Sequence, residues 1–125
     1  MTGRWNHNIH HHPLILGAAP SGCRNALDVG CGEGVLTREL RGVSERVVGI
    51  DCDRPSIEAA RAQGADGVEY VLGDFFEHPF EPGSFDLVAS VATLHHVDAE
   101  KGLARMAELV RPGGALAVIG LARSH

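Results

Sequence analysis

Residues 26–34 read Ala-Leu-Asp-Val-Gly-Cys-Gly-Glu-Gly, and residues 35–40 continue as Val-Leu-Thr-Arg-Glu-Leu. A short apolar run contains one acid, Asp28, glycines then take alternate positions, and Leu36 and Leu40 begin a helical spacing. This order predicts a buried strand, a tight turn and a helix N-terminus, an arrangement that receives nucleotide-like ligands in parallel α/β folds. Glycine suits such a turn because it has no Cβ to clash with the chain or a ligand. A glycine-rich turn without a ligand is the alternative.

Length, composition and charge exclude several classes of protein. The 125 residues suffice for one domain with a core, and a hydrophobic share of 44% is ordinary for a globular chain. The net charge of −5 does not indicate a basic surface of the kind that binds nucleic acid or an anionic membrane. No apolar run is long enough to span a membrane, and the 3 cysteines lack metal-like spacing. We therefore expect a cytoplasmic protein with reduced thiols that binds neither nucleic acid nor membrane.

Residues 1–24 differ from the rest and are expected to form a lid or flap on a core at residues 25–125. Pro13 suits the first turn of a short helix that ends near Gly17. The segment is interpreted as an apolar flap, as a lid with Trp5 near the mouth of the site, or, least favoured, as a metal site. We expect no metal, because adjacent histidines do not converge on one ion as an i, i+4 pair does.

The rest of the chain alternates strands and helices at the spacing of βαβ units, which predicts a doubly wound parallel sheet. The helix after the second strand is expected to stop at Gly64, and Asp98 is expected to cap the helix that Pro112 closes. The strands after the first are expected at residues 45–51, 68–74, 84–91 and 114–120.

An acidic residue ends the second expected strand. Asp51 follows Gly30 by 21 positions, the separation at which an acid at the next strand tip meets a ribose hydroxyl. A carboxylate can accept hydrogen bonds from both ribose hydroxyls. The alternative is that Asp51 or Asp53 caps the next helix, where Pro55 suits the first turn. Of the two acids, Asp51 is favoured for ribose.

The glycine spacing argues against a dinucleotide. Gly34 comes one residue early for G-x-G-x-x-G, and Val35 holds the position that needs Gly or Ala. No P-loop lysine follows the turn. We expect a nucleoside with a compact, largely uncharged tail that carries no phosphate, and a nicotinamide-dependent oxidoreductase is disfavoured.

Residues 27–34 resemble the first motif of class I S-adenosylmethionine-dependent methyltransferases, and later motifs of that family follow in order at residues 48–51, 73–75, 85–88 and 109–114. Within the family the chain is most similar to small-molecule methyltransferases related to the ubiquinone-biosynthesis enzymes. The resemblance implies S-adenosylmethionine as cofactor, a small-molecule methyl acceptor and strand order 3-2-1-4-5. The family fold normally continues with a helix and an antiparallel hairpin, and we expect this form to be truncated before them. A cofactor-binding fragment or regulatory module without turnover is therefore the alternative function.

The resemblance also implies roles for single residues. For the methionine portion it implies contacts from Asp28, Gly30, Cys31, Gly32, Gly34, Ser90 and Val91. For the nucleoside it implies Asp51 on the ribose hydroxyls and Cys52, Asp74 and Phe75 around the adenine. His95 is a candidate general base, because its ordinary pKa lies near neutrality. Transfer from a sulfonium is a one-step displacement, so no base is obligatory.

The fifth expected strand, residues 114–120, would lie at the border of the sheet in the implied strand order. Residues 115–119 carry no charge or proline, the features that keep natural strand edges from pairing with other chains. We expect a truncated form of the family fold whose outer edge is bare or covered by a second copy in a homodimer.

Overall fold

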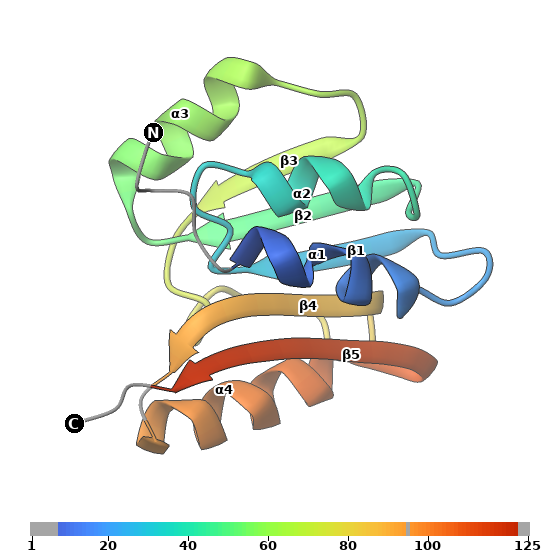
Figure 1. The fold of residues 1–125 in the computed structure, drawn as a ribbon. Helices are drawn as coiled ribbons and strands as arrows, with labels where there is room; N and C mark the ends of the chain where they lie inside the picture. Colours follow the sequence, from blue (N-terminus) through green and yellow to red (C-terminus); the bar gives the residue numbers. More distant parts are fainter. Residues whose placement is uncertain (1–7, 95, 123–125) are drawn as a thin grey trace.

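The computed structural model describes residues 8–94 and 96–122, which form a five-stranded parallel sheet flanked by helices (Figure 1). The strand order is β3-β2-β1-β4-β5, and every pairing is parallel, which confirms the predicted doubly wound sheet. In chain order the elements are α1 (Asn8–Gly17), β1 (Asn25–Val29), α2 (Val35–Leu40), β2 (Arg46–Asp51), α3 (Arg54–Gln63), β3 (Val68–Leu72), β4 (Phe85–Leu94), α4 (His96–Leu109) and β5 (Val110–Ala122).

Apolar clusters on both faces of the sheet hold the helices in place. Successive strand residues point to opposite faces, so neighbours such as Ala26 and Leu27 enter different clusters. One face packs Ile15 of α1 and Leu40 of α2 against the strands, and the other packs Met106 of α4. Helix α3 adds a smaller cluster against β3. The sheet is covered on both faces, as the near-continuous apolar strands require.

The first helix begins earlier than expected. It starts at Asn8, so Pro13 lies inside it and not in its first turn. Proline leaves a helix without one backbone hydrogen bond, but tertiary contacts hold this helix. The His12 Nδ1 atom donates to Glu39 Oε1 of α2 at 2.7 Å, and Ile15 is only 1% exposed. Trp5 lies outside the described residues, and the lid role of residues 1–24 stays a prediction.

The boundary between β4 and α4 also differs from the expectation. Strand β4 continues to Leu94 and α4 begins at His96, so Asp98 lies within the first helical turn and is not its cap. Acidic residues are favoured throughout a first turn by the helix dipole, so an acid does not fix the starting residue.

Strand β5 begins at Val110, four residues before the expected Gly114. The register pairs Phe85 with Val110 and then Leu87 with Ala115, so the chain bulges between these two pairs. Among the described residues only β4 pairs with β5, and the outer edge of β5 carries no partner strand. A homodimer through that edge stays a prediction.

Three absences hold for the described part of the chain. None of its helices combines the length and the apolar character needed to cross a membrane. No three of its His, Cys, Asp and Glu side chains are grouped so as to hold a metal ion. Cys23, Cys31 and Cys52 are free thiols.

Candidate functional site

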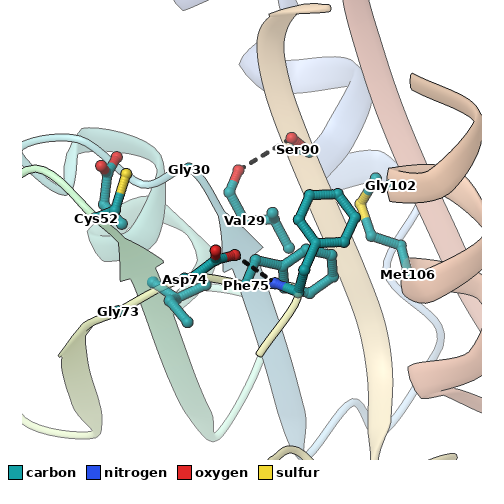
Figure 2. A pocket seen from close by; sticks show the side chains of 12 residues that line it. Val29, Gly30, Cys52, Gly73, Asp74, Phe75, Ser90, Gly102 and Met106 are labelled. Carbon is teal, nitrogen blue, oxygen red and sulfur yellow. Dashed lines mark hydrogen bonds between the residues drawn. The ribbon is translucent and has the colours of Figure 1, made fainter. Parts of the chain in front are cut away.

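A cavity of about 410 Å³ lies where the carboxyl ends of β1, β2 and β3 meet α4 (Figure 2). Its walls are Val29, Gly30, Ile50, Asp51, Cys52, Gly73, Asp74, Phe75, Phe76, Ser90, Gly102 and Met106. Figure 2 shows Gly102 and Met106 of α4 on one side and Cys52 on the other. Strand order reverses between β1 and β4, and ligands of open α/β sheets bind at such a switch point.

The glycine turn after β1 needs its glycines. Gly30, Gly32 and Gly34 have φ angles of 76°, 55° and 88°, a region that L side chains rarely adopt. The Gly30 and Cys31 amides both donate to the Ile50 carbonyl, at 2.8 and 3.1 Å, which fixes the turn to the end of β2. At Gly34 a Cβ would also collide with the Tyr70 hydroxyl.

We expect Gly32→Val to destabilise the protein by about 1–3 kcal/mol, because a β-branched residue is strained at φ 55°. A Cβ at Gly32 meets nothing within 4 Å, so the cost comes from the backbone and not from a clash. Urea denaturation measures it, with Gly17→Val as the control, since Gly17 also has open space but no positive φ. Equal losses in the two variants would contradict this explanation.

Asp51 joins the glycine turn to the end of β2. Its Oδ2 atom accepts from the Gly32 amide at 2.9 Å, and its Oδ1 atom accepts from the Asp53 amide at 2.9 Å. A carboxylate has about four acceptor positions, so two remain for a ligand. Asp53 instead caps α3, where its Oδ2 atom accepts from the Ser56 amide at 3.1 Å. The alternative that an acid caps the helix is therefore true of Asp53.

Asp74 orders the segment that follows β3. Its Oδ1 atom accepts from the Phe76 amide at 2.8 Å, and its carbonyl accepts from the amides of Glu77 and His78. The Phe75 and Phe76 rings lie 5.7 Å apart, and both line the cavity. The exposed carboxylate thus stands next to an aromatic wall, a pairing that suits a heteroaromatic ring with an exocyclic amine.

Asp28 lies in β1, two residues before the glycine turn, and is only 2% exposed. Its Oδ2 atom accepts from the Thr37 hydroxyl of α2 at 2.7 Å. Burial raises the pKa of this carboxyl to about 6, against the opposing effects of the Thr37 hydrogen bond and of His12. Charge on Asp28 is therefore costly in the ligand-free protein.

The cavity brings together six of the predicted site residues: Gly30, Asp51, Cys52, Asp74, Phe75 and Ser90. Gly32 and Gly34 belong to the adjoining turn, and Asp28 is bonded to Thr37 of α2, the helix that follows this turn. His95 lies outside the described residues. The roles assigned to all these residues stay predictions.

Cys31 and Val91 do not line the cavity. Cys31 packs with Ile57 and Tyr70, and burial raises the pKa of its thiol to about 12, so the thiol remains protonated. Val91 packs against the cluster around Ile15, on the sheet face opposite Ser90, because neighbouring strand residues alternate faces.

Six residues of the lining were not among the predicted site residues: Val29, Ile50, Gly73, Phe76, Gly102 and Met106. Gly102 lies inside α4, where a glycine is tolerated at a cost, and this was the one local signal at the position. Met106 is only 3% exposed and belongs to the core, but it also lines the cavity.

Comparison with known proteins identifies the family. A family model described as a methyltransferase domain matches residues 27–118, from β1 into β5. The chain belongs to this methyltransferase domain family. The matched part of the domain contains the glycine turn and every residue that lines the cavity.

Named relatives agree with that assignment. The domain is 37% identical over 121 residues to an uncharacterized methyltransferase of Mycobacterium tuberculosis, covering 95% of this chain and 61% of the relative. It is 37% identical over 101 residues to a ubiquinone biosynthesis O-methyltransferase of Thiobacillus denitrificans, covering 77% of this chain and 44% of that protein. The methyltransferase domain thus spans about three fifths or less of the length of these relatives.

A solved structure shows the same fold. The S-adenosylmethionine dependent methyltransferase of Mesorhizobium loti is 30% identical, with a TM-score of 0.69 over 83% of this chain and 50% of that one.

Proposed function

We propose that the cavity binds S-adenosylmethionine and that the protein transfers its methyl group to a small-molecule acceptor. The observation that carries the proposal is the position of Asp51, at the tip of β2, where it hydrogen-bonds the glycine turn and lines the cavity. The names of the relatives, among them a ubiquinone biosynthesis O-methyltransferase, support methyl transfer to a small molecule. Three free cysteines are consistent with a cytoplasmic location.

The residues around the cavity fit this cofactor. A volume of about 410 Å³ lies within the ordinary range for small-ligand sites. Asp51 has acceptor positions left for two ribose hydroxyls, and Asp74, which precedes Phe75, would accept from the adenine amino group. None of the described residues that line the cavity is a lysine or arginine, which fits a ligand without phosphate.

When bound, the cofactor supplies an activated methyl on a sulfonium, and the protein's contribution is to hold the donor and exclude water. The Phe75, Phe76 and Met106 side chains would exclude water from the nucleoside. Asp28, near the ammonium group in this proposal, would be stabilised in its charged form by the ligand.

Parallel calorimetric titrations with S-adenosylhomocysteine and NAD test the binding step. We expect one site for the former and no heat with NAD. An acceptor screen with a radiolabelled methyl donor then tests turnover: label on a small molecule supports the enzyme, and binding without transfer to any acceptor supports the regulatory module.

Asp51→Ala is expected to weaken S-adenosylhomocysteine binding by about 1–3 kcal/mol, because a charge-assisted hydrogen-bond partner is lost. Calorimetry measures the change. Asp53→Ala is the matched control, since this acid lies two positions away and caps α3: it should cost about 1 kcal/mol of stability and leave binding unchanged. Unchanged affinity in Asp51→Ala, or equal losses in the two variants, would show that the ribose assignment is wrong.

A further inference from the structure

Arg105 of α4 reaches across to the segment that forms the aromatic wall of the cavity. Its Nη2 atom donates to the His78 carbonyl at 2.7 Å, and its guanidinium carbon lies 5.7 Å from the centre of the Phe75 ring. Its Nη1 atom pairs with Glu108, one helical turn further on, at 3.2 Å. One side chain therefore contacts both the aromatic residue in the wall and the backbone three residues beyond it.

The placement of Arg105 has a cost. The side chain is only 20% exposed, and its Nε atom is buried without a hydrogen-bond partner among the described residues. A buried, unpaired donor is unfavourable, and a methionine at this position would avoid the penalty while filling much of the same space. The contacts that offset this cost are those with Phe75, His78 and Glu108.

The segment has two points of attachment. At its start Asp74 accepts the Phe76 amide and orders the turn. At its end Arg105 holds the His78 carbonyl. Phe75 and Phe76 lie between these points, next to Met106, so the position of the wall depends on both attachments.

We propose that Arg105 is a positioning residue of the cofactor site: it fastens residues 75–78 to α4 and so fixes the Phe75 wall against which the nucleoside lies. The inference deepens the proposed function and depends on it. Arg105 does not line the cavity, so its effect on binding passes through Phe75. Ordering the wall before binding lowers the entropy cost that the ligand would otherwise meet.

The test compares Arg105→Met with Arg61→Met. Arg61 makes a similar bond from α3 to a strand, with its Nη2 atom 3.0 Å from the Tyr70 carbonyl, but it lies outside the cavity. Calorimetry with S-adenosylhomocysteine and with 5′-methylthioadenosine, which lacks the amino-acid tail, measures affinity. We expect Arg105→Met to weaken both ligands about tenfold and by the same factor, Arg105→Lys to recover part of the loss, and Arg61→Met to leave both unchanged.

Hydrogen exchange on the ligand-free proteins separates this inference from the proposed function. The amides of Phe76, Glu77 and His78 should exchange about tenfold faster in Arg105→Met than in the parent, and at the parent rate in Arg61→Met. If Arg105→Met does not fold, Arg105→Lys is measured in its place. The same amides should then exchange faster than in the parent, by a smaller factor than is expected for Arg105→Met. The inference would be overturned by unchanged amide exchange or by parent-like affinity in Arg105→Met. It would also be overturned by an equal loss of affinity in Arg61→Met, or by a loss of affinity for S-adenosylhomocysteine alone. A parent that binds neither ligand would refute the proposed function, and exchange alone would then decide whether Arg105 holds the segment.

Discussion

Asp28→Asn is expected to make the ligand-free protein more stable near neutral pH, by about 2–3 kcal/mol. Burial raises the pKa of the Asp28 carboxyl from 3.8 to about 6, so the buried group is ionised at neutral pH at a cost in stability. Asparagine has nearly the same shape, keeps an oxygen for the Thr37 hydroxyl and carries no charge. The same variant should bind S-adenosylhomocysteine more weakly, because it no longer attracts the ligand's ammonium group.

The pH dependence of stability should show that it is the ionised form of Asp28 that destabilises the folded protein. A carboxyl whose pKa is raised in the folded state contributes stability that is present below its unfolded value, and this contribution is lost as pH rises. The loss should therefore fall between about pH 4 and about pH 6 in the parent and be absent from Asp28→Asn. Urea denaturation across this range measures the difference between the two proteins. A difference that does not change with pH, or a less stable variant at neutral pH, would contradict the buried charge.

Asp86→Ala is expected to destabilise the fold by about 2–4 kcal/mol. The Asp86 side chain is buried at the start of β4, and its Oδ2 atom accepts from the Arg24 and Asn25 amides at 2.8 and 2.9 Å. Its Oδ1 atom accepts from Arg111 Nε. One carboxylate thus joins the start of β1 to the bulge in β5, and removing it leaves three donors without this acceptor.

Two comparisons sharpen that prediction. Burial alone would raise the pKa of Asp86, but the bonds from Arg111, Asn25 and Arg24 outweigh it and lower the pKa. The contribution of Asp86 to stability is therefore present at neutral pH and lost as pH falls below the ordinary range of an aspartate.

Arg111→Met, which removes a partner that is 42% exposed, should cost only about 0–1 kcal/mol. Urea denaturation that ranks Arg111→Met above Asp86→Ala in cost would contradict this explanation.

The sequence predicted the features that depend on local order. The run at residues 26–40 predicts strand, turn and helix, because apolar spacing and glycine chemistry act over a few neighbours. The 21-residue separation placed Asp51 at the tip of β2, and the structure has it there, hydrogen-bonded to Gly32. Element boundaries were predicted less well: Pro13, Asp98 and Gly114 each suit a terminus, but α1, α4 and β5 all begin before these residues.

The parts that could not be predicted depend on contacts between distant segments. Cys31 packs against α3 and β3 and does not line the cavity. No short sequence pattern predicts this packing. Val91 packs on the other face of the sheet from Ser90, because neighbouring residues of β4 alternate faces, and its contact with the cofactor stays a prediction. The bond between Arg105 and the His78 carbonyl joins residues 27 positions apart, so no local pattern indicates it.

The most direct measurement of the central claim is a nuclear magnetic resonance titration of the ¹⁵N-labelled protein with S-adenosylhomocysteine. If the cavity is the cofactor site, the amides of Gly32, Cys52, Phe75 and Phe76 should shift with one common dissociation constant. The amides at the opposite end of the sheet, such as Arg46 at the start of β2, should stay in place. Saturable shifts confined to residues away from the cavity, or no shifts at millimolar ligand, would contradict the account.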